Sequence, residues 1–285
     1  MPSTKSPLDL TLYYASGACS RVPHILRTDL SIPFSKTRLD ITTLPSGAQV
    51  LAPADGSMTH EEYKRAVQPH GMIPALRVRD DVITEMPAIL TYIVALAEQQ
   101  GKQWLGDPAD ALERARSLSL VCWLSGSLHS GALALAWRPL HFSDDEGTWE
   151  AVQAKGRGLA EERFEMLEGM LRERVERGTA KKEFVLREEF GVLDVNVYLF
   201  YAFARRFGFE RIDERLPFLK EVVRNVEARE SSKVVSEIEG WELYTVLIQS
   251  CLDANGNVVA KDVFGKKIVV ETRQASADVA AELAS

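Results

Sequence analysis

The chain has few cysteines, and the three that it has lie far apart. Among 285 residues only Cys19, Cys122 and Cys251 carry a thiol. Three scattered cysteines exclude a disulfide framework and do not have the spacing of a zinc cluster. The same scarcity is typical of a reducing compartment. We therefore expect a cytoplasmic protein without a metal site.

Positive charge is also scarce. The chain has 34 Lys and Arg against 41 Asp and Glu, which gives a net charge of −7. This balance argues against a nucleic-acid-binding surface as the main function. The first nine residues lack the apolar run of a signal peptide, and no segment of the chain repeats. The apolar content of 46% and the charged content of 26% are typical of a globular protein.

One stretch approaches the length and composition of a membrane span. No Lys, Arg, Asp or Glu occurs between Arg116 and Arg138, which is close to the length that crosses a bilayer. Polar and small residues interrupt the stretch, however, among them Ser125, Gly126, Ser127, His129, Ser130 and Gly131. We therefore expect a buried helix of a bundle, straight or kinked, and no membrane contact.

The first hundred residues predict a small α/β domain. Strand patterns and helix patterns alternate in the order β-α-β-α-β-β-α. A segment rich in Gly, Pro, Ala and Ser predicts a long loop over 42–57. The predicted strands are 10–15, 34–41, 74–78 and 82–84, and the predicted helices are 20–30, 60–67 and 85–100.

The pattern changes after a linker at 101–108. Helical periodicity then predominates, which predicts an all-helical domain over 107–240 after a first domain at 1–100. Residues 241–285 form an extra tail of mixed character, in which 253–257 resembles the turn of a hairpin. The predicted helices of the second domain are 111–140, 147–178, 194–207 and 217–229.

The segment from Leu10 to Leu26 has the composition of a chemical site. A strand pattern leads to Cys19 and Ser20, and Pro23 follows in what the pattern predicts to be the first turn of a helix. Free N–H groups and the positive end of the helix dipole favour an anion at such a place, including a thiolate.

Three motifs together resemble a known family. The pattern Tyr13–Ile25 reads Y-Y-A-S-G-A-C-S-R-V-P-H-I, Ile73-Pro74 precedes a hairpin strand, and Glu85 begins a predicted helix. Over residues 8–240 the chain is similar to the glutathione transferase superfamily, and most similar to its bacterial beta class. The resemblance implies a thioredoxin-like domain followed by a helical bundle. It also implies glutathione as co-substrate and a homodimer.

The resemblance assigns a glutathione site. Ile73 and a cis Pro74 would offer backbone groups to the cysteinyl unit of glutathione. Glu85 would hold the γ-glutamyl end, and Met86 occupies the position beside it. The structural alternative for Glu85 is an ordinary acidic residue in the first turn of a helix, without a role in binding.

The resemblance also assigns catalytic candidates. Cys19 would lie near the glutathione sulfur and would either form a hydrogen bond with it or form a mixed disulfide with it. His129 would line the active site on the long helix, with Trp123 as a pocket wall. Ser20 and Tyr14 are further donors to the sulfur. Each has a structural alternative: a small buried residue for Cys19, a helix cap for Ser20, and core packing for Tyr14, His129 and Trp123.

Several positions depart from the family pattern. Met86 stands where the family has a serine that binds the glutathione carboxylate, so that this group depends on backbone N–H groups. Gly191 replaces the usual Ser or Thr before Asp194, the acid of the family's helix N-capping box. Cys122 replaces an asparagine, and the loop 42–58 is longer than in the family.

Three functions stay open. The first is a transferase that joins the glutathione sulfur to a small hydrophobic electrophile. The second is an isomerase, lyase or cyclase of the same fold that acts on a specific secondary metabolite, which Met86 and the tail suggest. The third is a non-catalytic binding module, against which the joint presence of Cys19, Ser20 and Glu85 argues.

Overall fold

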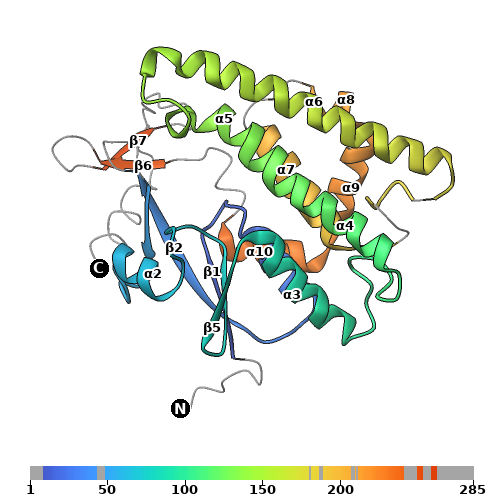
Figure 1. Cartoon of the computed structure of the whole chain (residues 1–285), viewed down its shortest axis with the longest axis horizontal. Coiled ribbons are helices and arrows are strands. Elements are labelled where there is room, and N and C mark those ends of the chain that lie inside the picture. Colours follow the sequence, from blue (N-terminus) through green and yellow to red (C-terminus); the bar gives the residue numbers. More distant parts are fainter. Residues whose placement is uncertain are drawn as a thin grey trace.

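The strands lie together on one side of the molecule and the long helices on the other (Figure 1). The structure is a computed structural model. The residues that it describes are 9–43, 49–179, 181–185, 189–206, 209, 211–240, 249–252 and 258–261.

The sheet is centred on β1 (Leu10–Tyr14). β2 (Ser35–Thr43) pairs with β1 in parallel, and β4 (Ala75–Val78) pairs with β1 in antiparallel orientation. β5 (Asp81–Thr84) continues the sheet beyond β4. This arrangement confirms the predicted α/β order of the first part of the chain. It also places the ends of β1 and β4, which carry the candidate site, side by side.

Three helices accompany this sheet. They are α1 (Arg21–Asp29), α2 (His60–Ala66) and α3 (Met86–Glu98). α1 and α3 pack against each other, and their apolar side chains belong to the main core. Burial of such apolar faces provides most of the stability of short helices. The shared core residues include Val22, Ile25, Leu26, Ile89, Leu90 and Ile93.

The second part of the chain is helical. A continuous run consists of α4 (Ala111–Trp123), the π-helical segment η1 (Leu124–Leu133) and α5 (Ala134–Trp137). α6 (Trp149–Glu176) and α7 (Val192–Arg206) follow. α7 is the centre of this part, because all its side chains from 192 to 204 are buried.

The long run around η1 is less buried than the sequence suggests. By length and composition it is the one helix among the described residues that could cross a membrane, and 28% of its apolar window is buried. Leu128 and Leu133 are fully buried, whereas Cys122 and Gly126 are exposed. The expectation of a buried bundle helix therefore holds for one face of the run.

Two elements differ from the sequence-based prediction. The segment predicted to be a loop contains β3 (Gln49–Pro53), which pairs with the extended end of β2, and only 44–48 lies outside the described residues. The chain also continues from α8 (Ile212–Arg215) and α9 (Pro217–Ala228) into α10 (Glu230–Glu239), which was not predicted. Both omissions are short segments, in which periodicity is a weak signal.

The tail contributes a hairpin to the sheet. β6 (Gln249–Leu252) pairs in parallel with β2 at Thr42 and Thr43, and β7 (Val258–Lys261) pairs with β6 in antiparallel orientation. The two strands of the predicted hairpin are therefore confirmed. The predicted turn at 253–257 and the remainder of the tail lie outside the described residues.

The start of α7 explains one departure from the family pattern. Asp194 accepts hydrogen bonds from the backbone N–H groups of Val185 and Gly191, each at 2.7 Å. Burial raises the pKa of Asp194 to about 7, against the effect of these donors. A Cβ atom at Gly191 would lie 2.6 Å from the carbonyl oxygen of Trp104. A serine or threonine cap does not fit here without a backbone shift.

Candidate functional site

Cys19 and the Ile73-Pro74 peptide are brought together. Cys19 lies in the turn before α1, and its Sγ donates a hydrogen bond to the carbonyl oxygen of Ile73 at 3.5 Å. The Ile73-Pro74 bond is cis, as the resemblance implies. Pro74 is buried, and Ile73 is half-buried. Two motifs distant in the sequence therefore meet at one edge of the sheet.

Two opposing effects act on the pKa of the Cys19 thiol. Burial raises its pKa to about 11 from the ordinary 9.0. The charge of Arg138 and the backbone N–H groups of Cys19 and Ser20 lower this pKa, but less than burial raises it. The start of the helix therefore does not by itself make this thiol acidic, and the role of Cys19 at the glutathione sulfur stays a prediction. Cys19 carries a proton at neutral pH and is a hydrogen-bond donor.

Ser20 and Tyr14 have structural surroundings. Ser20 is fully buried, and its hydroxyl donates to the carbonyl of Ala15 and accepts from the N–H of Ala15, both at 3.1 Å. Ser20 precedes α1 but makes no side-chain capping bond, so the predicted cap is absent. Tyr14 is buried, and its ring packs 5.0 Å from the ring of His24. We do not include either residue in the proposed site.

Glu85 stands at the start of α3 in an unusual backbone conformation. Its φ is 65° and its ψ is 122°, a combination that is costly for a residue with a side chain. The side chain is exposed, and its charge reaches Cys19, whose pKa it raises. Backbone strain of this kind concentrates at functional sites.

Met86 does not point toward this site. Its side chain is only 6% exposed and packs in the main core with Ile89 and Leu90. Pro87 follows and has no N–H group, so that the N–H groups of Met86 and Ala88 are the ones available to an anion at this helix start. Any role of Met86 in binding glutathione is therefore limited to its backbone.

His129 lies on the π-helical segment, among aromatic rings. Its ring is 5.1 Å from that of Phe200, 5.8 Å from that of Trp137 and 6.2 Å from that of Phe203. Burial, with a smaller contribution from the charge of Arg138, lowers its pKa to about 4. His129 is therefore a neutral imidazole at pH 7. Regular π-helix is rare and is frequent at functional sites.

Trp123 precedes the π-helical segment and is half-buried against the main core. This position fits both of its sequence-based interpretations, a core residue and a pocket wall.

Two small hollows of the described structure lie beside other residues, one at Trp104 and Asp194 and one at Phe164 and Phe209.

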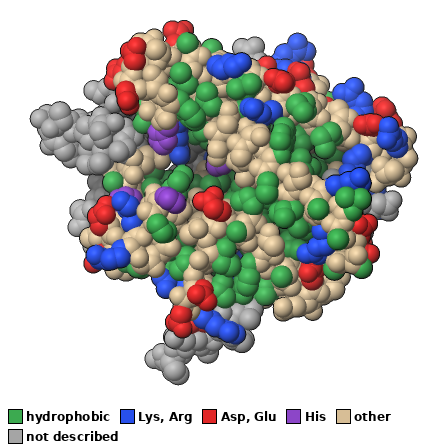
Figure 2. All heavy atoms as spheres, viewed as in Figure 1, with side chains coloured by type: hydrophobic (Ala, Val, Ile, Leu, Met, Phe, Trp, Pro, Cys, Tyr) green, Lys and Arg blue, Asp and Glu red, His purple; other side chains and the backbone are tan. Residues whose placement is uncertain are grey.

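Arg138 is the residue that sequence reasoning missed. It follows the last residue of α5, and its charge lowers the pKa of Cys19 and also those of His129 and His141. The thiol of Cys19 and the imidazole of His129 are therefore linked through one guanidinium. On the face in Figure 2, histidine and basic side chains border a hollow that also has apolar walls.

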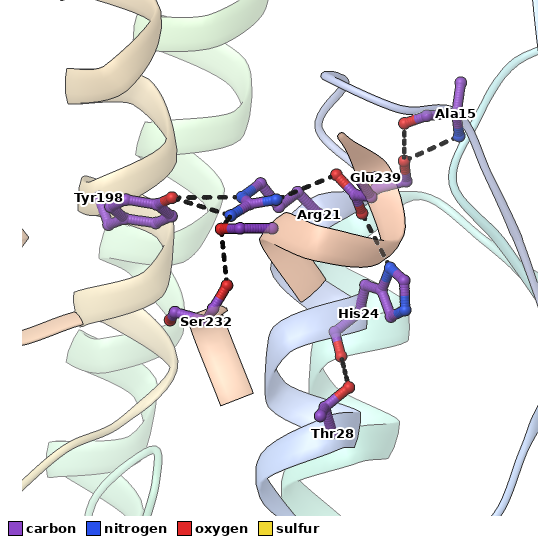
Figure 3. Close-up of polar contacts among 9 residues, drawn as sticks. Ala15, Arg21, His24, Thr28, Tyr198, Ser232 and Glu239 are labelled. Atoms are coloured by element: carbon purple, nitrogen blue, oxygen red, sulfur yellow. Dashed lines mark hydrogen bonds and ion pairs between the residues drawn. The ribbon is translucent and has the colours of Figure 1, made fainter. Parts of the chain in front are cut away.

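A buried polar cluster joins α1 to the helical part (Figure 3). Arg21 contacts Glu239 at 3.2 Å and donates to the hydroxyl of Tyr198 at 3.1 and 3.3 Å. His24 Nδ1 lies 2.8 Å from the other carboxylate oxygen of Glu239. These side chains are fully enclosed or nearly so. They hold α1, and with it Cys19, in a fixed position relative to α7 and α10.

No group of three or more His, Cys, Asp and Glu side chains with metal-binding geometry occurs among the described residues. The expectation of a site without metal stays a prediction.

Comparisons with known proteins agree with the fold. No protein-family model matches the chain. A glutathione S-transferase of Xanthomonas campestris pv. campestris is 30% identical over 120 residues, which are 42% of this chain. The chain spans half the length of this curated relative.

Solved structures match most of the chain. A glutathione transferase homologue from Sulfitobacter with bound glutathione is 23% identical, with a TM-score of 0.64 over 80% of this chain and 97% of its own. The beta-class glutathione S-transferase of Sphingomonas chungbukensis is 20% identical, with a TM-score of 0.61 over 81% and 99%. A sphingomonad glutathione S-transferase complexed with glutathione is 21% identical, with a TM-score of 0.61 over 81% and 98%. These findings confirm the expected fold and the resemblance to the superfamily with beta-class neighbours.

Proposed function

We propose that this chain, which has the fold of glutathione transferases, binds glutathione and joins its sulfur to a small hydrophobic electrophile. The observation that carries the proposal is the meeting of Cys19 with the carbonyl of Ile73, beside the cis Pro74. The charge of Glu85 reaches the same thiol. Two of the structural neighbours contain glutathione, which supports the same ligand here.

Glutathione would lie beside the first residues of β4, directly after Ile73 and Pro74. The backbone of Ile73 would pair with the cysteinyl unit, and Glu85 would face the α-amino group of the γ-glutamyl end. The exposed position of Glu85 and its strained backbone fit a residue held in place for a ligand. The cysteinyl sulfur would then lie near Cys19.

Cys19 would act as a donor and not as a nucleophile. Its thiol keeps its proton at pH 7. This single S–H donates to the Ile73 carbonyl in the structure and would turn to the sulfur of glutathione when glutathione binds. A donor at that sulfur favours the glutathione thiolate over the thiol and so lowers the pKa of the co-substrate. The thiolate then attacks the electrophilic carbon. In a substitution the leaving group departs with its bonding electron pair, and in an addition the π electron pair moves to a neighbouring atom, which then takes up a proton. The glutathione thiol proton leaves to solvent or to the product.

The second substrate would bind on the helical side. His129 is neutral there and can donate or accept one hydrogen bond. The surrounding rings of Trp137, Phe200 and Phe203 provide an apolar wall. A hydrophobic electrophile fits such surroundings. A homodimer, a cytoplasmic location and a role in secondary metabolism stay predictions from the sequence.

Calorimetric titration of glutathione tests the glutathione site. We expect binding to the wild-type protein, weakened about tenfold or more in Glu85→Ala, because hydrogen bonds to charged groups contribute about 1.5–3 kcal/mol. Glu150→Ala is the matched control, since Glu150 is also an exposed acid in the first turn of a helix. Equal affinities of the wild-type and Glu85→Ala proteins would remove Glu85 from the site.

A further inference from the structure

Arg138 is a partly enclosed cation that forms no ion pair with a carboxylate of the described residues. Its Nε atom is buried and has no hydrogen-bond partner among the described residues. Two other partly buried arginines have carboxylate partners: Arg205 contacts Asp213 at 2.9 Å, and Arg229 contacts Asp29 at 2.7 Å. Arg27, which is fully buried, donates instead to the carbonyl oxygens of Ile32 and Pro33. The electrostatic neighbour of Arg138 is the thiol of Cys19.

It is energetically unfavourable to enclose the charge of Arg138 without an anionic partner. A guanidinium keeps its charge in proteins, and its transfer from water is unfavourable unless an anion or several acceptors compensate it. Burial lowers the pKa of Arg138. In the described structure neither Cys19, which is protonated, nor His129, which is neutral, supplies a negative charge. An anion that arrives with a ligand would compensate this charge.

The position of Arg138 indicates the chemistry of that ligand. Trp137 precedes it directly, and the ring of Trp137 contacts those of His129 and Phe203. An apolar aromatic wall thus adjoins a single cation. A planar guanidinium binds carboxylates through two parallel hydrogen bonds. A hydrophobic molecule that carries a carboxylate matches both features.

We propose that Arg138 binds a carboxylate of the second substrate, so that this enzyme selects hydrophobic electrophiles that bear an acid group. The inference rests on the proposed function, because it places glutathione at Cys19 and Ile73. Glutathione also has carboxylates and a thiolate. Its proposed contacts, however, lie on β4 and at the start of α3, whereas Arg138 belongs to the helical part beside His129. The second substrate is therefore the better source of the carboxylate.

A matched pair of probes tests this assignment. 4-Chloro-3-nitrobenzoate and 4-chloro-3-nitrobenzamide have the same ring but differ in charge. Their affinities are measured by quenching of tryptophan fluorescence, with S-methylglutathione present because it cannot react. We expect the wild-type protein to bind the benzoate about tenfold or more tightly than the benzamide. Equal affinities in the wild-type protein would overturn the proposal without any variant.

Variants of Arg138 test whether this residue causes the preference for the benzoate over the benzamide. Arg138→Gln should abolish the discrimination between the two probes, and Arg138→Lys should keep part of it, since a lysine retains the charge without the fork geometry. Arg116→Gln is the control, because Arg116 is an exposed arginine on the same helical run. Thermal melting of each variant shows whether it is folded. A discrimination that persists in folded Arg138→Gln would refute the assignment.

The failure of this inference can be told from the failure of the proposed function. Calorimetric titration of glutathione into wild-type and Arg138→Gln proteins gives the second measurement. Absence of binding to the wild-type protein would refute the glutathione site itself. Binding that weakens in Arg138→Gln, with the benzoate preference intact, would assign Arg138 to glutathione and overturn the inference. Unchanged glutathione binding with lost preference is the result that we expect.

Discussion

The protonated state of Cys19 leads to a quantitative prediction about its reactivity. At pH 7 a thiol with a pKa of about 11 is ionised in about one molecule in 10⁴, whereas an ordinary thiol of pKa 9.0 is ionised in about one in 10². A more basic thiolate is also a better nucleophile, by about six- to tenfold for two pKa units. We therefore expect Cys19 to react about tenfold more slowly than an ordinary accessible thiol, before any slowing by restricted access.

The pH profile is the clearer readout, because it is independent of access. The native protein is pulse-labelled with iodoacetamide over a range of pH, and the peptide that contains Cys19 is quantified by mass spectrometry. The labelling rate should still be rising at pH 10. In urea, where burial is lost, the midpoint should return to about the ordinary value of 9.0.

A native midpoint at pH 8 or below would refute the reasoning. It would mean that Arg138 and the backbone N–H groups outweigh burial. Cys19 would then be a thiolate able to attack oxidised glutathione, which gives a mixed disulfide and releases one reduced glutathione. The proposed role of Cys19 as a donor to the glutathione sulfur would then be wrong.

Two further predictions concern stability, measured by urea unfolding. Gly191→Ala should lower the free energy of unfolding by about 1–3 kcal/mol, because the added Cβ meets a carbonyl oxygen at 2.6 Å. Gly158→Ala, at an open helical position, should instead raise it by about 0.5–1 kcal/mol. Glu239→Ala should cost about 3–5 kcal/mol, because it removes a fully buried carboxylate from its ion pair. Glu237→Ala, exposed on the same helix, should change stability by about 0.5 kcal/mol at most; similar values for the two glutamate variants would contradict the importance of the buried cluster.

Much of the fold could be predicted because the signals were local. The strand before Cys19, the hairpin after Pro74 and the long helices follow from alternation, turn residues and helical periodicity. β3 was missed because its five residues lie next to a segment rich in Gly and Pro. Its strand character comes from pairing with β2, which no local pattern encodes.

The candidate site was predictable only in part. Cys19 and Ile73 could be placed together because a resemblance linked their motifs. The ionisation of Cys19 could not be predicted, because it depends on how burial balances nearby charges. Arg138 gave no signal, since its proximity to Cys19 arises from the packing of the helical part on the sheet. The burial of Met86, in contrast, could be predicted from helical periodicity, because Met86 forms the buried face of α3 together with Ile89, Leu90 and Ile93.

The central claim is that Cys19, the Ile73 carbonyl and Glu85 form one glutathione site. A crystal structure of the protein soaked with glutathione tests this most directly. We expect a bound glutathione whose cysteinyl backbone pairs with Ile73, whose α-amino group faces Glu85 and whose sulfur lies within hydrogen-bonding distance of Cys19. Glutathione bound at another surface, or its absence from this site at saturating concentration, would contradict the account.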